Sequence, residues 1–308
     1  MTMIRKRKIR IKWKNLIIFL VLIILTIFSF IKITQGVIKL ISESNKPKSK
    51  EIVKKKKKIT DLDKKLEKLD NINKEIDYFN NDYIDRYISY KEKHTEYPNI
   101  QIIKNVNMNL DLEPYKDIQE ANTSYNEKIL VNKYYYLGKD YVPENLQTIS
   151  NKYALSNMKL VDYAKDAFEE MAKAAEKDKM KIIAMSTYRS YDYQVNLYNK
   201  YVKSDGKEKA DTYSGRAGHS EHQTGLAADV YNGKTNYTNF ESTKEFDWMQ
   251  KHAHEYGFIL RFPKDKEDET GYVYESWHYR YVGKDIAKYI YEHNISYEEY
   301  YATMIKDK

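Results

Sequence analysis

The 308-residue sequence contains no cysteine, which excludes the structures and sites that depend on thiols. It can have no disulfide framework, no thiolate zinc finger and no cysteine nucleophile. Any zinc would have to be bound by histidine and carboxylate side chains, which favours a catalytic site over a structural one. A glycine-rich phosphate loop, a P-loop lysine pattern and an internal repeat are also missing. The sequence therefore does not indicate a nucleotide-binding or a repeat protein.

Positive charge is concentrated at the N-terminus. The whole chain has a formal net charge of +8, yet residues 1–58 hold 17 lysines and arginines against two acidic residues. The remaining 250 residues hold 36 basic and 43 acidic side chains, so the bulk of the protein is mildly acidic. A nucleic-acid-binding protein would be expected to have its basic patch on the folded domain. We therefore expect no nucleic-acid partner.

The first 41 residues have the pattern of a membrane anchor. Seven basic residues within 5–14 precede an apolar run at 16–31, which residues 33–41 can extend to the length that a bilayer requires. No small-residue cleavage site follows the run, which favours an uncleaved anchor over a cleaved signal peptide. The basic flank stays in the cytoplasm and places everything after Lys32 outside it. We expect a single-pass protein of the cell membrane with an extracytoplasmic catalytic domain.

Two segments separate this anchor from the compact part of the chain. Residues 42–58 are polar and end in five lysines, which predicts a basic linker. In residues 59–129 the apolar side chains between Ile59 and Tyr90 recur at steps of three and four, which predicts a helical stalk and connecting segment. This stalk could form a dimer as a coiled coil or pack onto the body of the protein. Several asparagines weaken a coiled-coil seam, and both alternatives remain open.

Residues 130–308 form the predicted compact domain. The patterns predict strands at 130–137, 181–186, 226–230 and 277–282, and helices at 160–177, 191–201 and 246–256, the last ended by Gly257. Strands and helices follow one another without a regular βαβ rhythm. We therefore expect an α+β fold with a mainly antiparallel sheet flanked by helices.

One ten-residue segment, 220–229, holds half of a metal site. It places His222 and Asp229 seven positions apart within a run of small residues, and Glu275 precedes a second histidine, His278, by three positions. Two histidines and one aspartate leave zinc an open position for water, and a glutamate that is not a ligand can serve as the base. Taken singly, each of these residues would more often be an ordinary core or surface residue. Together they predict a hydrolytic zinc site.

The remaining histidines in this part of the chain do not fit that pattern. His219 lies three residues before His222 in a predicted loop, and His252 and His254 lie on the predicted helix at 246–256. We expect His252 and His254 to be polar surface residues.

The motif Ser220-x-His222-x-x-Gly225-x-Ala227-x-Asp229, followed by Glu275-x-Trp277-His278, resembles the zinc D-alanyl-D-alanine carboxypeptidases of the VanY type. The segments Val131-Asn132-Lys133, Tyr188-Arg189-Ser190 and 277–283 resemble that family as well, and the resemblance covers residues 130–292. Ala217 and Gly138 depart from it, since prolines are usual at both positions. Both departures concern the stiffness of loops.

The resemblance implies a hedgehog/DD-peptidase fold and a role for each matching residue. His222, Asp229 and His278 would bind one zinc ion, and Glu275 would be the catalytic base. Arg189 would polarise the scissile carbonyl or hold the terminal carboxylate of the substrate. Two further residues, Gln194 and Ser220, resemble substrate-contacting positions.

We therefore expect a membrane-anchored, extracytoplasmic D-alanyl-D-alanine carboxypeptidase. It would remove the C-terminal D-alanine from peptidoglycan stem peptides by the attack of zinc-activated water. An L,D-carboxypeptidase or an endopeptidase could use the same site with a different pocket. An alternative from another class is a non-catalytic protein that binds the cell wall, which a degraded site would support. Instead, all three predicted ligands and the base are present.

Overall fold

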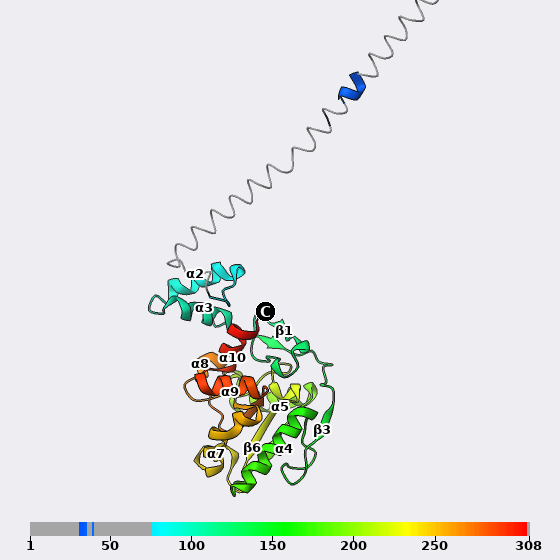
Figure 1. Cartoon of the computed structure of the whole chain (residues 1–308), viewed down its shortest axis with the longest axis vertical. Coiled ribbons are helices and arrows are strands. Elements are labelled where there is room, and N and C mark those ends of the chain that lie inside the picture. Colours follow the sequence, from blue (N-terminus) through cyan, green and yellow to red (C-terminus); the bar gives the residue numbers. More distant parts are fainter. Residues whose placement is uncertain (1–30, 36–38, 40–75, 307–308) are drawn as a thin grey trace, which may run out of the picture. The chain divides into compact units, whose positions relative to one another are not determined.

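The computed structural model describes residues 31–35, 39 and 76–306. By its contacts the chain divides into one unit at 1–70 and a second at 71–308, and Figure 1 shows the described parts of both as coloured ribbons. The predicted basic linker lies outside the described residues, as does most of the predicted anchor, of which 31–35 and 39 are helical. None of the described helices combines the length and apolarity that a bilayer crossing needs. The anchor and the linker stay predictions.

Two short helices begin the described part of the second unit. Helices α2 (Ile84–Lys93) and α3 (Asn99–Asn107) pack against each other. Only α2 overlaps the stretch in which steps of three and four predict a helix, and residues 59–75 of that stretch lie outside the described residues. An ion pair of 2.6 Å joins Lys104 of α3 to Glu299 of helix α10 (Tyr297–Tyr300) near the C-terminus. These contacts favour packing onto the body of the protein, while dimerisation and a domain boundary at residue 130 stay predictions.

A four-stranded antiparallel sheet lies at the centre of the second unit. Its strands are ordered β5 (Ile183–Ser186), β6 (Ala227–Tyr231), β8 (His278–Tyr281) and β7 (Phe258–Leu260). Two further pairs lie outside it, β1 (Gln119–Glu120) with β2 (Tyr135–Tyr136) in parallel and β3 (Leu146–Thr148) with β4 (Lys159–Val161) antiparallel. The predicted α+β fold with a mainly antiparallel sheet is therefore confirmed for this unit.

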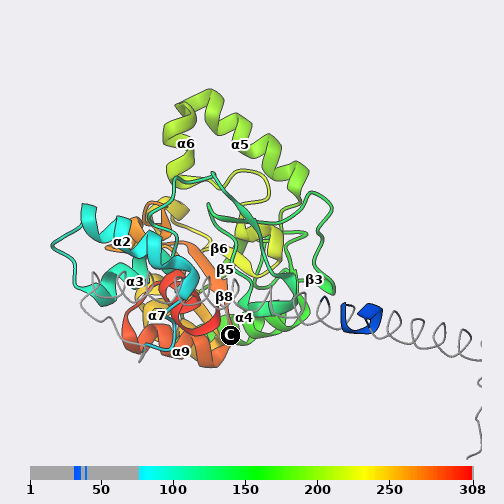
Figure 2. The ribbon, with the colours of Figure 1, turned by 90° about the horizontal axis from the view of Figure 1, so that it is seen from above.

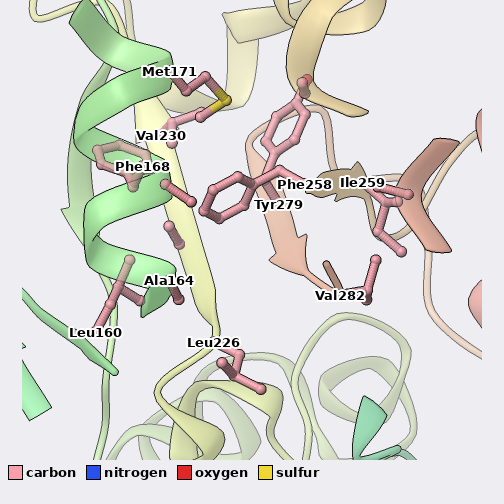
Figure 3. Close-up of a cluster of buried hydrophobic side chains, with 14 of the residues drawn as sticks. Leu160, Ala164, Phe168, Met171, Leu226, Val230, Phe258, Ile259, Tyr279 and Val282 are labelled. Carbon is pink, nitrogen blue, oxygen red and sulfur yellow. The ribbon is translucent and has the colours of Figure 1, made fainter. Parts of the chain in front are cut away.

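Helix α4 (Asp162–Lys177) covers one face of the sheet. Its buried side chains recur at helical spacing, and Phe168 meets Phe258 of β7 edge to face, with 6.0 Å between the ring centroids. Figure 3 shows this core, in which Val230 of β6 points towards α4, whereas the hydroxyl of Tyr279 of β8 accepts a hydrogen bond from Gln250 at 3.3 Å. Helices α7 (Lys244–His252), α8 (Glu267–Thr270) and α9 (Lys284–His293) complete the fold. The opposite face of the sheet is left for the polar residues of the strands.

One predicted strand is wrong. Most of the segment 130–137 is buried, but only Tyr135 and Tyr136 form a strand. Asn132 is the cause, because its side-chain oxygen accepts hydrogen bonds from the backbone N–H groups of Tyr134 and Tyr135. This side-chain turn replaces the backbone ladder that the β-branched and aromatic residues predict.

The other predicted elements are found with shifted ends. The helix predicted at 246–256 is α7 followed by a 3₁₀ turn, Ala253–Tyr256, and it ends at Gly257, whose φ of +83° favours glycine. The helix predicted at 191–201 runs four residues further, as α5 (Tyr191–Asp205). It is followed after Gly206 by α6 (Lys207–Tyr213). In Figure 2, α5 and α6 stand away from the central sheet, and we call this pair the arm.

A candidate metal centre

The sheet brings the three predicted metal ligands together. His222 lies on a 3₁₀ turn, Glu221–Thr224, and the ladder between β6 and β8 pairs Asp229 with His278. One ligand atom from each of the three residues lies within 4.8 Å of the others, and all three side chains are buried. Because neighbouring side chains on a strand point to opposite faces, Asp229 points away from α4 while Val230 points towards it.

A glycine makes the turn between His222 and β6 possible. Gly225 has a φ of +69°, and a Cβ at this position would lie only 2.9 Å from the side chain of Leu146. A larger residue would therefore combine backbone strain with a clash. The small residues of the motif do allow the close approach that the sequence predicts.

The hydrogen bonds of the two histidines determine which ring nitrogens can bind a metal. Nδ1 of His222 lies 2.7 Å from the carbonyl oxygen of Thr187, which can only accept, so Nε2 is left with its lone pair facing Asp229 at 3.3 Å. Nδ1 of His278 lies 2.9 Å from the other carboxylate oxygen of Asp229. Two imidazole nitrogens and one carboxylate form a donor set that fits zinc and leaves a coordination position open.

The protonation of His222 and Asp229 suits metal binding, whereas His278 must give up a proton to bind a metal. Although burial acts in the opposite direction, its hydrogen bonds to Asp229 and Glu221 raise the pKa of His278 to about 9. Burial, with Arg189 acting in the same direction, lowers the pKa of His222 to about 4, so its ring is neutral at neutral pH. Although burial opposes ionisation, His222 and Arg189 hold the pKa of Asp229 well below its ordinary value. A neutral imidazole and an ionised carboxylate are the forms that bind zinc.

Glu275 lies beside the ligands without being one of them. Its carboxylate is buried, and Oε2 lies 3.9 Å from Nδ1 of His278. Burial raises the pKa of Glu275 to about 8, although the neighbouring His278 acts in the opposite direction. A carboxylate with a pKa near neutrality is suited to taking up and giving back a proton.

Arg189 lies on the same side of the sheet. Its Nη2 donates to Oδ2 of Asp229 at 2.6 Å and to the hydroxyl of Ser186 at 2.7 Å. These contacts place the guanidinium group directly beside the metal-binding carboxylate. Its predicted contact with the substrate stays a prediction.

The site opens into a cavity of about 660 Å³. Gln194 and Ser220, the two residues predicted to contact substrate, both line it. Gln194 donates to the carbonyl oxygen of Gly215 at 2.7 Å, and its buried Oε1 has no hydrogen-bond partner among the described residues. The arm also lines the cavity, with Tyr193, Leu197, Lys200, Tyr201, Ser204, Asp205 and Tyr213.

The other histidines are not part of the metal group. His219 lies in a loop, as predicted, and is buried there, with its Nδ1 2.7 Å from the carbonyl oxygen of Asn132. The ring of His254 stacks on Tyr291 with a centroid distance of 3.8 Å, and both His252 and His254 are half-buried. Their assignment as surface residues is therefore only partly right.

Sequence reasoning missed the charged residues behind the site. Glu221, Arg261, Arg280 and Glu298 are almost completely buried and pair with one another. Glu221 stands inside the predicted motif, but its partners lie 40 or more residues away, and only the folded chain shows that they meet. Strand alternation was the one available signal, since it places Arg280 on the same face of β8 as His278.

Known proteins resemble this chain in both sequence and structure. A family model described as VanY, D-alanyl-D-alanine carboxypeptidase, matches residues 157–284, a range that contains all the predicted site residues. The putative carboxypeptidase YodJ of Bacillus subtilis is 38% identical over 203 residues, which cover 64% of this chain and 74% of that protein. A D-alanyl-D-alanine carboxypeptidase of Enterococcus faecium is 33% identical over 202 residues, which cover 63% of each.

Three solved structures have a similar fold. The LD-carboxypeptidase LdcB has a TM-score of 0.57 at 38% identity, and the match covers 61% of this chain and 91% of that one. VanYB in complex with D-alanine-D-alanine has a TM-score of 0.51 at 30% identity, with 58% and 98% covered. A mutant of the vancomycin resistance D,D-pentapeptidase VanY in complex with Zn(II) has a TM-score of 0.50 at 30% identity, with 57% and 98% covered.

The chain therefore belongs to the VanY family of D-alanyl-D-alanine carboxypeptidases. It is accordingly an enzyme, a zinc metallopeptidase of the carboxypeptidase type.

Proposed function

We propose that this enzyme removes the C-terminal D-alanine from peptidoglycan stem peptides. The observation that carries the proposal is the complete set of His222, Asp229 and His278 with a buried, non-ligating Glu275 beside them. The relatives support the substrate class, since one is a D-alanyl-D-alanine carboxypeptidase and a similar structure contains D-alanine-D-alanine.

The side chains of the site divide the reaction between them. Zinc held by His222, Asp229 and His278 would supply Lewis acidity, polarising the scissile carbonyl and acidifying a water molecule. Glu275 takes the proton from the attacking water and gives it to the leaving amine of D-alanine, for which its place beside the ligands suits it. Nε and Nη2 of Arg189 already donate to Ser186 and Asp229, so the N–H groups of Nη1 are the donors it offers to the terminal carboxylate or to the developing oxyanion.

The cavity then selects the peptide. Gln194 and Ser220 line the same cavity as the metal ligands and are the proposed polar contacts to the substrate. The buried, unpaired Oε1 of Gln194 would accept a hydrogen bond from a peptide N–H group of the substrate. This contact would satisfy a polar atom that otherwise has no partner among the described residues.

An L,D-carboxypeptidase is the second candidate, because LdcB has the highest TM-score of the three structures compared. The two activities differ in the stereochemistry of the residue before the scissile bond, which the shared metal site does not select. An endopeptidase acting on peptidoglycan would use the same site with a longer pocket. A non-catalytic wall-binding protein would not need Glu275 beside the metal ligands.

One experiment separates these candidates. The purified full-length chain is incubated with pentapeptide and tetrapeptide stems, with zinc and with a chelator, and the released products are identified by mass spectrometry. D-Alanine released from the pentapeptide alone supports the D,D-activity, and release from the tetrapeptide supports the L,D-activity. If neither stem is cleaved in a chelator-sensitive way, the proposed function is wrong.

We further propose that the enzyme is anchored in the cell membrane with its catalytic domain outside the cytoplasm. The proposal rests on the basic flank and the apolar run in residues 1–41. Protease added to intact cells should then degrade the catalytic domain and leave a membrane-bound N-terminal fragment. Full protection of the domain in intact cells, with degradation only after lysis, would contradict this orientation.

A further inference from the structure

Glu221 lies directly behind one of the metal ligands. Its Oε2 atom lies 3.4 Å from Nε2 of His278, the ring nitrogen that points away from Asp229. Glu221 is only 4% exposed and lies on the same 3₁₀ turn as His222. A carboxylate can only accept a hydrogen bond, and Nδ1 faces the carboxylate of Asp229 in the same way at 2.9 Å. Once a metal takes the lone pair of Nδ1, the contact with Glu221 holds the one remaining ring proton on Nε2.

The other oxygen of Glu221 is held by two arginines. Oε1 accepts from Nε of Arg261 at 2.8 Å and from Nη1 of Arg280 at 3.0 Å. The two arginines are 1% and 0% exposed, so the carboxylate is fixed from a side that water does not reach. Charge-assisted hydrogen bonds of this kind are stronger than neutral ones and hold the geometry of both partners.

Arg261 extends the network of ion pairs to helix α10. Its Nη1 donates to Oε2 of Glu298 at 2.8 Å, and its Nη2 donates to Oε1 of the same residue. Glu298 belongs to α10 and also accepts from the side-chain amide of Asn132 at 3.2 Å. Two carboxylates and two guanidinium groups therefore balance their charges within the protein interior.

We propose that Glu221 is a positioning residue of the metal site. By accepting the Nε2 proton of His278, it keeps the lone pair of Nδ1 directed at the metal that His222 and Asp229 share. Arg261 and Arg280 fix the orientation of Glu221. This inference rests on the proposed metal site and adds a function for a motif residue that sequence reasoning passed over.

The substitution Glu221→Gln tests the proposal because it preserves shape and reverses one hydrogen bond. The arginines can only donate, so they require the carbonyl oxygen of the new amide, and the NH₂ group must then face His278. An NH₂ group donates to Nε2 and moves the ring proton to Nδ1, the nitrogen that should bind the metal. Zinc affinity should fall by about 10- to 100-fold, as is typical when the hydrogen-bond partner of a metal-binding histidine is lost.

Glu298→Gln is the matched control. It removes the same unit of negative charge from beside Arg261, but Glu298 does not contact His278. Both variants should lower the melting temperature of the metal-free chain, because each leaves buried arginine charge uncompensated. Only Glu221→Gln should weaken zinc binding, measured on the full-length chain by competition with a chromophoric chelator. Equal zinc affinities in Glu221→Gln and the wild type would overturn the proposal, as would equal losses in the two variants.

A spectroscopic measurement on the wild type decides the matter even if Glu221→Gln does not fold. With ¹⁵N-labelled histidine, the zinc-loaded chain should show His278 bound through Nδ1 and carrying a proton on Nε2. Coordination through Nε2, or an Nε2 without its proton, would show that Glu221 does not position this ring. A wild-type chain that binds no zinc at all would refute the proposed metal site, and the inference with it.

Discussion

The two walls of the cavity are built in different ways. We call the turn Glu221–Thr224 with strands β6 and β8 the sheet wall, and the helices α5 and α6 the arm wall. In the sheet wall the metal-binding residues are buried and held by strand pairing and hydrogen bonds. In the arm wall Tyr193 is 56% exposed, and the neighbouring cavity residues Leu197 and Tyr201 are only half-buried.

This difference separates two tasks. Metal binding and proton transfer require atoms fixed to within a fraction of an ångström, which a sheet core provides. Recognition of a peptide tolerates small adjustments, which exposed side chains on a projecting helix pair allow. We therefore expect substitutions in the sheet wall to reduce the rate of the chemical step and those in the arm wall to change substrate affinity.

The largest effect should come from His222→Ala in the sheet wall. It removes one of three metal ligands and leaves Asp229 without its imidazole neighbour. Zinc should no longer copurify with the protein, and carboxypeptidase activity should fall by about a thousandfold or more. His252→Ala on α7, where the ring is half-buried and outside the metal group, is the control and should keep both. Zinc bound at wild-type affinity in His222→Ala would remove this residue from the site.

Glu275→Gln should separate catalysis from metal binding. The amide has the size of the carboxylate but cannot take up a proton, and Glu275 is not one of the proposed ligands. We expect kcat to fall by about 10²- to 10⁴-fold while the zinc content stays that of the wild type. Full turnover by the variant would show that another group is the base, and loss of zinc would show that Glu275 also supports the ligands.

Arg189 lies between the two walls, and Arg189→Lys should reduce activity less than the two preceding substitutions. Lysine keeps the positive charge beside Asp229 but loses the N–H groups of Nη1. We expect kcat/KM to fall by about 10²-fold with zinc retained. Kinetics on a stem peptide whose terminal carboxylate is amidated would identify the partner of Arg189. If Arg189 holds that carboxylate, the wild type should lose its advantage over the variant on this substrate.

The sheet wall was largely predictable because its functional residues lie close together in the sequence. His222 and Asp229 are seven residues apart, and Glu275 and His278 are three apart, so two short segments hold the whole reactive set. The small residues and Gly225 indicate a tight turn next to a strand, which the structure contains. Four of the functional side chains could therefore be named before the fold was known, and the strand pairing of Asp229 with His278 brings the two segments together.

The ion network was not predictable, because its members are far apart in the sequence. Glu221 and Arg261 are 40 residues apart, and Arg261 and Glu298 are 37 apart, so their pairing depends on the complete tertiary fold. A glutamate or an arginine in a sequence is far more often exposed than buried. The prediction of a strand at 130–137 was wrong because of a single side chain. Asn132 accepts hydrogen bonds from backbone N–H groups that a strand would use for its ladder.

The smallest effect should come from Tyr201→Ala in the arm wall, and it is the sharpest test of the difference between the walls. Tyr201 lines the cavity and packs edge to face on Tyr213 of α6, with 5.2 Å between the ring centroids. Loss of one aromatic contact between this wall and a bound peptide would be worth about 1 kcal/mol, which corresponds to a rise in KM of about fivefold with kcat nearly unchanged. Tyr291→Ala on α9, outside the residues that line the cavity, should leave both constants unchanged. A fall in kcat of Tyr201→Ala comparable with that of Glu275→Gln would mean that the arm also positions the reacting groups, and the two walls would then share one task.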